Sequence, residues 1–113
     1  MEIQYHGANC VSLNAKKTKV VVDDNLNQVG LKNVSSKAAI NIYTQKRLEE
    51  GAETDGFVID SPGEYEVAAV SVLGFKAKAH TDHEEESSAV VYRVVVSGIM
   101  VGVLGHIDGN LSD

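Results

Sequence analysis

The stretch Asp60–His80 reads DSPGEYEVAAVSVLGFKAKAH. It holds the only proline of the chain, Pro62, directly before Gly63, and this pair predicts a sharp turn between two strands. Residues 64–79 alternate well enough between apolar and polar side chains to predict a pair of strands that leads into His80. A histidine that a strand delivers to a loop is often used in metal binding or acid–base chemistry. His80 is therefore the first candidate site residue.

Length, charge and cysteine content limit the classes of protein to consider. The 113 residues suit a single domain spanning residues 1–113. The formal net charge of −6 argues against binding to nucleic acid or to anionic membranes, both of which need a basic face. The longest apolar stretches run about ten residues, half of a membrane span, and no signal peptide is visible at the N-terminus. The single cysteine, Cys10, cannot form an internal disulfide, which predicts a cytoplasmic location.

Strand patterns dominate the chain, with one short helix among them. Thr44 can cap a helix over residues 45–50, and the polar segment 25–37 is typical of a loop. The dipeptide Ser97-Gly98 predicts the turn of the clearest hairpin, whose first strand is apolar enough to be buried on both faces. The sequence therefore predicts a mainly β (α+β) domain with a multi-stranded mixed or antiparallel sheet and one short helix. The expected strands cover residues 3–6, 10–13, 19–22, 38–43, 57–60, 64–67, 70–79, 87–96 and 99–104.

Three parts of the sequence carry a resemblance to a known family. They are Ile3–Leu13 with Val20–Asp23, Gly63–Val67, and Ser88–Arg93 followed by Val103–His106. In this order and spacing they resemble the metallo-β-lactamase superfamily, and within it the branch of small bacterial hydrolase-like proteins related to the ascorbate-6-phosphate lactonase. The resemblance implies an αββα sandwich, of which this chain would match only the N-terminal half, essentially one sheet.

The family's chemistry depends on a His-x-His-x-Asp-His loop that holds one or two zinc ions, and the zinc activates a hydroxide for hydrolysis. The resemblance places this loop directly after the strand at residues 38–43. The corresponding positions in this chain are Gln45, Arg47, Glu49 and Glu50. No histidine lies between His6 and His80, and a guanidinium is not a metal ligand. The resemblance thus implies that the principal metal loop has been lost.

The other family ligands are kept only in part. By the resemblance, His80 matches the next ligand, while the bridging aspartate falls on His106, with Asp108 two residues later. The candidate metal ligands are therefore His80, His106 and Asp108, as remnant positions. His83 and Asp82 are further candidates for a site of two histidines and one carboxylate. The alternative is that His80 is an inherited remnant and His83 is simply solvated.

Other chemistry-bearing residues have structural interpretations. His6 directly follows the first strand pattern, so we expect it to cap a turn, and the acidic run at residues 82–86 is typical of a solvated loop. Glu64 and Glu66 share one face of a strand without a partner acid in a different environment, so we expect a structural role in the turn. Cys10 has no basic cluster nearby in sequence, which predicts a buried, unreactive thiol.

Three hypotheses follow for function. The preferred one is a degenerate family member that has no catalysis and no cofactor and acts as a structural or interaction module. Because half of a sandwich would leave an apolar sheet face in water, we expect this face to pair with a second copy or with a C-terminal-half partner. The alternative is a zinc-dependent hydrolase whose remaining ligands come from a second chain or from a C-terminal half. The third is a β-rich ligand-binding module whose likeness to the family is accidental.

Overall fold

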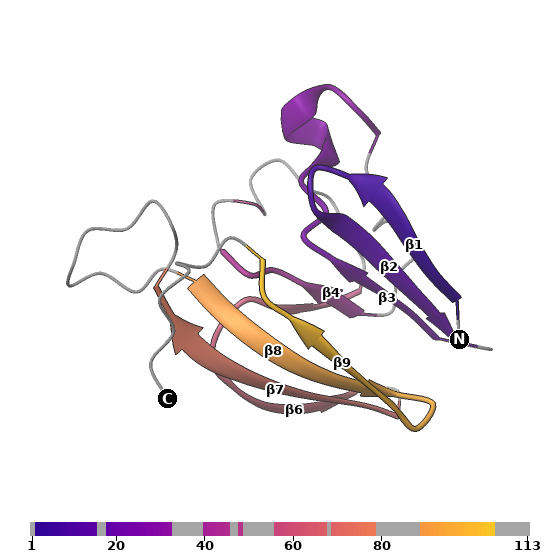
Figure 1. The fold of residues 1–113 in the computed structure, drawn as a ribbon, viewed down its shortest axis with the longest axis vertical. Coiled ribbons are helices and arrows are strands. Elements are labelled where there is room, and N and C mark those ends of the chain that lie inside the picture. The colour runs from indigo at the N-terminus through magenta and orange to yellow at the C-terminus, as the bar shows by residue number, and fades with distance from the viewer. Residues whose placement is uncertain are drawn as a thin grey trace.

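The computed structural model describes residues 2–15, 18–32, 40–45, 48, 56–67, 69–78 and 89–105. Within these ranges nine strands form two sheets that lie one against the other (Figure 1). The fold class is confirmed, since the chain is mainly β with mixed and antiparallel pairing. No helix in the described part has the length and apolar character needed to cross a bilayer.

The first sheet has five strands in the order β1-β2-β3-β4-β5. The strands are β1 (Glu2–Gly7), β2 (Cys10–Ala15), β3 (Thr18–Val22), β4 (Ile40–Ile42) and β5 (Phe57–Ile59). The first three pair antiparallel, whereas β4 and β5 add on in parallel. The ends of β3 and β4 therefore meet at one edge of the sheet.

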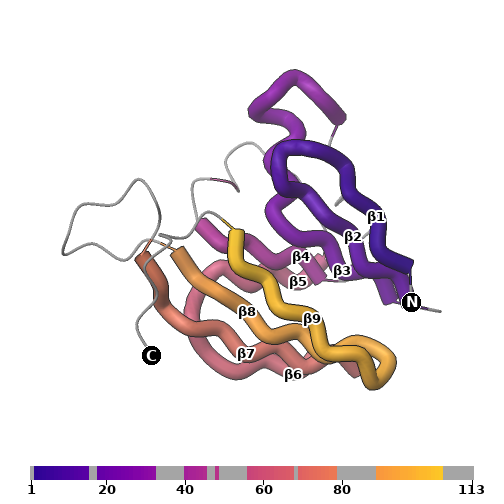
Figure 2. Tube along the Cα trace, viewed as in Figure 1, coloured from indigo at the N-terminus to yellow at the C-terminus, as the bar shows by residue number. Residues whose placement is uncertain are grey.

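The second sheet is an antiparallel meander in the order β6-β7-β8-β9. The strands are β6 (Gly63–Val67), β7 (Val70–Ala77), β8 (Ala89–Val96) and β9 (Ile99–Val103). The predicted turn at Pro62 and Gly63 carries the chain from the first sheet into the second (Figure 2). The hairpin between β8 and β9 turns at Ser97 and Gly98, both with positive φ, as a two-residue hairpin loop requires.

The core lies between the two sheets. Because residues alternate in each strand, one face of each sheet supplies only apolar side chains to this layer. The buried members are Leu13, Val20, Val22, Ile40, Ile42 and Ile59 from the first sheet and Val70, Val72, Val90, Tyr92, Val94 and Val96 from the second. The expectation of essentially one sheet with an open inner face is therefore wrong, because the chain supplies the second sheet itself.

Three segments differ from the sequence prediction or lie partly outside the described residues. Beyond its first residue, Ala89, the strand β8 is fully buried on one face only, since on the other face Arg93 is exposed and Val91 and Val95 are half-buried. The predicted loop at residues 25–37 contains a short 3-10 helix, Leu26–Val29, which ends at Gly30. Most of the predicted helix at residues 45–50 lies outside the described residues. Only Gln45 and Leu48 of this segment are described.

Candidate functional site

Two buried side chains join the ends of the parallel strands β3 and β4. Asp23 follows β3 with a φ of 51°, and its backbone N–H donates to the carbonyl oxygen of Ile42 at 2.7 Å. Thr44 follows β4 and donates its backbone N–H to Oδ1 of Asp23 at 2.7 Å and its Oγ1–H to Oδ2 at 2.6 Å. Both residues are almost fully buried. The carboxylate therefore fixes the start of the segment in which the resemblance leads us to expect the metal loop.

The same threonine also lies against the second sheet. The backbone N–H of Val90 donates to the carbonyl oxygen of Thr44 at 2.8 Å, and the Tyr92 hydroxyl donates to the carbonyl oxygen of Tyr43 at 2.8 Å. Gly105, with a φ of 60°, packs so closely on Thr44 that an added Cβ would lie 2.8 Å from the Cβ and Cγ2 of the threonine. The backbone that directly precedes His106 thus touches Thr44.

The strands that lead toward the candidate ligands end at one common edge. Both β7 and β9 run antiparallel to β8, so Ala77 at the end of β7 lies beside Ala89, and Val103 at the end of β9 lies beside Tyr92. Ala77 pairs with Ala89, whose neighbour Val90 is bonded to Thr44. The chain after β4 and the chain after β9 therefore meet at Thr44, and the end of β7 lies nearby, beside Ala89. Loops that leave a rigid scaffold at neighbouring positions can build a site together.

A groove of about 250 Å³ lies beside this edge, between the first sheet and β9. Its walls are mostly apolar, and its carboxylate is that of Asp23, whose two oxygens already accept hydrogen bonds from Thr44. A carboxylate held in this way supports the backbone and does not offer a general base to the groove.

The candidate metal ligands His80, His106 and Asp108 lie outside the described residues, as do Asp82 and His83. The same holds for three of the four positions of the lost motif, Arg47, Glu49 and Glu50. The fourth, Gln45, is buried directly after Thr44. In the described ranges, no three His, Cys, Asp or Glu side chains come together as metal ligands. The described residues therefore do not fit a zinc ion, and no catalytic step follows from them.

Comparison with known proteins identifies the family. A family model described as a beta-lactamase superfamily domain matches residues 2–113. The chain belongs to the β-lactamase superfamily. No curated protein matches it. Among solved structures, it is similar to a Thermotoga maritima protein classed as a Zn-dependent hydrolase of the metallo-β-lactamase superfamily, with a TM-score of 0.67 and 24% identity.

The match to that solved structure covers 91% of this chain and 47% of the other chain. The chain thus spans about half the length of that hydrolase structure, and at this identity the likeness shows the fold alone. The superfamily that the sequence resembles is confirmed.

Cys10 lies next to this region, beneath the 3-10 helix, and it is buried as the sequence predicts. Burial, together with the negative charges of Asp24 and Asp23, raises the pKa of its thiol to about 12, against an opposing effect of Lys19. The thiol is therefore protonated and unreactive at neutral pH.

The reactivity of the Cys10 thiol can be measured directly. Because its pKa rises from 9.0 in the unfolded chain to about 12, the native protein should hold about a thousandfold less thiolate at pH 8 than the unfolded protein. Ellman's reagent should therefore modify Cys10 at least a hundredfold more slowly in buffer than in denaturant. Since the native pKa is raised, this contribution to stability is present below pH 9 and declines as pH rises toward 12. Equal modification rates in both conditions would contradict the assignment.

The structure changes the expected roles of His6 and of the pair Glu64 and Glu66. His6 lies within β1, and its Nε2 is 2.9 Å from Oγ of Ser12 on β2, so it links two strands and does not cap a turn. Glu64 and Glu66 do share one exposed face of β6. The turn before β6, however, is held by the Tyr65 hydroxyl, which donates to the carbonyl oxygen of Ser61 at 2.8 Å.

Sequence reasoning missed Asp23 and Thr44 as site-forming residues. A usable signal was present, since each polar residue follows directly on a β-branched or apolar strand pattern. If both strands are parallel neighbours, such residues meet at one edge. The sequence did not show that β3 and β4 pair in parallel, and for this reason the pair was not recognised.

Proposed function

We propose that this chain is a non-catalytic structural or interaction module built on the metallo-β-lactamase fold, and that it self-associates. The proposal is carried by a difference between the backbone and the side chains at one edge of the first sheet. The hydrogen bonds from Thr44 to Asp23 and the close contact of Thr44 with Gly105 hold the backbone firmly. The position that the resemblance assigns to the first metal ligand, however, holds a buried amide, Gln45. An amide is a weak ligand for zinc compared with imidazole or thiolate.

The rest of the proposal is supported by composition. A net charge of −6 favours protein partners over nucleic acid or anionic membranes. A single cysteine, buried and unpaired by any disulfide, suits a reducing cytoplasm, and the resemblance to a bacterial branch suits a bacterial protein. Selection for folding and association, without selection for hydrolysis, would keep the fold and allow the metal motif to be lost.

Zinc addition tests the absence of a metal site. A native state that binds zinc is stabilised by it, so the melting temperature of a metal-binding protein rises with zinc concentration. We expect about 50 µM zinc to change the melting temperature by less than about 1 °C. A rise of several degrees that saturates at one equivalent per chain would contradict the proposal.

A second candidate function is a metal-dependent hydrolase completed by a second polypeptide or by a C-terminal half. Two observations favour it. The strands that precede His80 and His106 end at the edge around Thr44, and the chain spans 47% of the hydrolase structure that it matches. In this case His80, His106 and Asp108 are the zinc ligands. A zinc-dependent rise in melting temperature that is lost in both His80→Ala and His106→Ala would support it.

A further inference from the structure

The outer face of the second sheet has an unusual composition. An antiparallel sheet with one face in water normally places polar residues on that face. Here the outward positions of β7, β8 and β9 are mainly apolar. They include Leu73, Phe75, Val91, Val95 and Met100, and Phe75 and Met100 are 54% and 63% exposed. None of these five side chains belongs to the core between the sheets. The face is therefore suited to burial against a partner.

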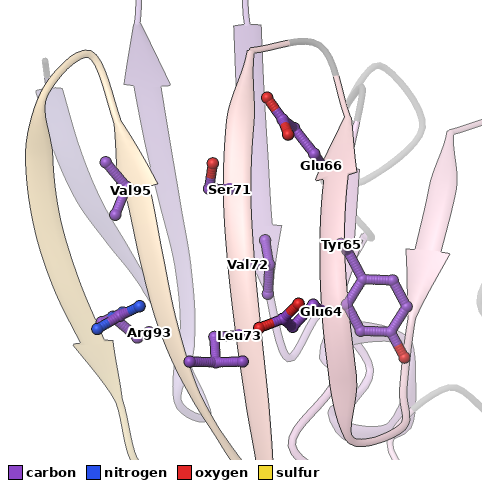
Figure 3. Close-up of a pocket in the computed structure, with 8 residues that line it drawn as sticks. All are labelled: Glu64, Tyr65, Glu66, Ser71, Val72, Leu73, Arg93 and Val95. Carbon is purple, nitrogen blue, oxygen red and sulfur yellow. The ribbon is translucent and has the colours of Figure 1, made fainter.

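Charged residues of both signs lie on this same face. In the strand register, Glu64 on β6 lies opposite Leu73 on β7, and Leu73 lies opposite Arg93 on β8. Figure 3 shows Leu73 between the two charged side chains, which line a shallow pocket of about 400 Å³ together with Glu66 and Ser71. Two strand spacings, about 10 Å, separate Glu64 from Arg93, and no ion pair joins them in the described structure.

This order of charges is self-complementary. Consider two copies packed face to face about a two-fold axis that runs along β7 in the plane between them. The axis exchanges the strands on either side of β7, so Leu73 meets Leu73 of the second copy, and Arg93 meets Glu64 of the second copy. Each dimer then contains two such ion pairs around an apolar centre. An axis at right angles to β7 would instead place Arg93 against Arg93.

We propose that the chain forms a two-fold dimer through this outer face, with Arg93 of each copy paired to Glu64 of the other. The inference rests on the self-association in the proposed function and names its surface, which is not the inner face that the sequence suggested. The partner is a second copy of the chain because the face is self-complementary: the negative charge lies on one side of β7 and the positive charge on the other. An isologous interface requires such a self-complementary surface.

The size of the face predicts the strength of the dimer. Four strands and eight residues span about 15 Å by about 27 Å, which is roughly 400–500 Å² from each partner. A standard stable interface buries about 800 Å² from each partner. We therefore expect a dissociation constant in the micromolar range and fast exchange between monomer and dimer.

Charge reversal with sedimentation equilibrium tests the arrangement, from about 1 to about 200 µM protein. The variants Glu64→Arg and Arg93→Glu each place like charges together twice per dimer, so each should weaken association at least tenfold. The double variant restores both pairs and should dimerise like the natural protein. Mixing the two single variants should also give a dimer, because every pair in the mixed species again joins opposite charges. The matched controls are Glu2→Arg and Lys32→Glu, both exposed on the other sheet or its loops.

The possible results distinguish an error in the proposed surface from a failure of the proposed self-association. If the natural protein dimerises but the single variants dimerise equally well, the surface is wrong and the self-association stands. If single variants stay folded by circular dichroism but neither the double variant nor the mixture associates, the two-fold pairing is wrong. If the natural protein remains a monomer at the highest concentration, the self-association in the proposed function falls with it. In that case a C-terminal-half polypeptide becomes the expected partner of the face.

Discussion

Replacing Asp23 with alanine should remove about 3–5 kcal/mol of the free energy of unfolding. The carboxylate accepts two buried hydrogen bonds from Thr44, and each hydrogen bond to a charged group contributes about 1.5–3 kcal/mol. Alanine leaves the two donors of Thr44 buried without this acceptor. It also tolerates the positive φ of 51° less well than aspartate. A domain of this size has only about 5–15 kcal/mol in total, so the variant should be largely unfolded well below the natural melting temperature.

Urea unfolding at one fixed protein concentration measures this loss. Asp23→Asn keeps one acceptor oxygen and a side chain that accepts positive φ, so it should lie between alanine and the natural protein. Glu2→Ala removes an exposed carboxylate from β1 and should change stability by less than about 0.5 kcal/mol. If Asp23→Ala were as stable as Glu2→Ala, the carboxylate would not be holding the edge of the site.

The second large effect is expected for Gly105→Ala, at about 2–4 kcal/mol. Positive φ costs an L-residue about 1–2 kcal/mol, and overpacking typically adds about 1–3 kcal/mol. The new methyl group would collide first with Oγ1 of Thr44, which Asp23 holds in place, and would lie 2.8 Å from the Cβ and Cγ2 of the same side chain. The side chain of Thr44 therefore has little freedom to move aside.

Gly98→Ala separates strain from contact. Gly98 also has positive φ, at 77°, but no heavy atom lies within 4 Å of an added Cβ. It should cost only the backbone strain, about 1–2 kcal/mol. Thr44→Ser removes Cγ2 but keeps Cβ and Oγ1, the atom nearest to the added methyl group, so it should recover only a small part of the loss in the Gly105→Ala background. Equal costs at positions 98 and 105 would mean that the contact with Thr44 has no energetic consequence.

The strands could be predicted from sequence because each follows a local pattern. Alternation in Glu64–Val67 and Val70–Ala77, and the turn residues Ser97 and Gly98, specify conformation within a few residues. The division into two sheets is not local. Alternation shows that a strand has an apolar face, but it does not show which other strand covers that face. For this reason the second sheet, begun at Gly63, was not foreseen.

The site is harder to predict for the same reason. Asp23 and Thr44 are 21 residues apart, and Gly105 lies far beyond both, so only the fold brings them together. Similarly, Glu64 and Arg93 lie on either side of Leu73 only because of the strand register, which the sequence does not specify locally. The prediction that the metal motif has changed, by contrast, needs only the sequence, because the resemblance indicates which positions to inspect.

We propose that the chain keeps the frame of a metal site without the capacity to hold the metal. Elemental analysis of protein purified without chelators is the decisive experiment. We expect less than about a tenth of an equivalent of zinc, manganese or iron per chain. A metal content near one or two equivalents, retained through dialysis and lost in His80→Ala, would contradict the claim and support the hydrolase.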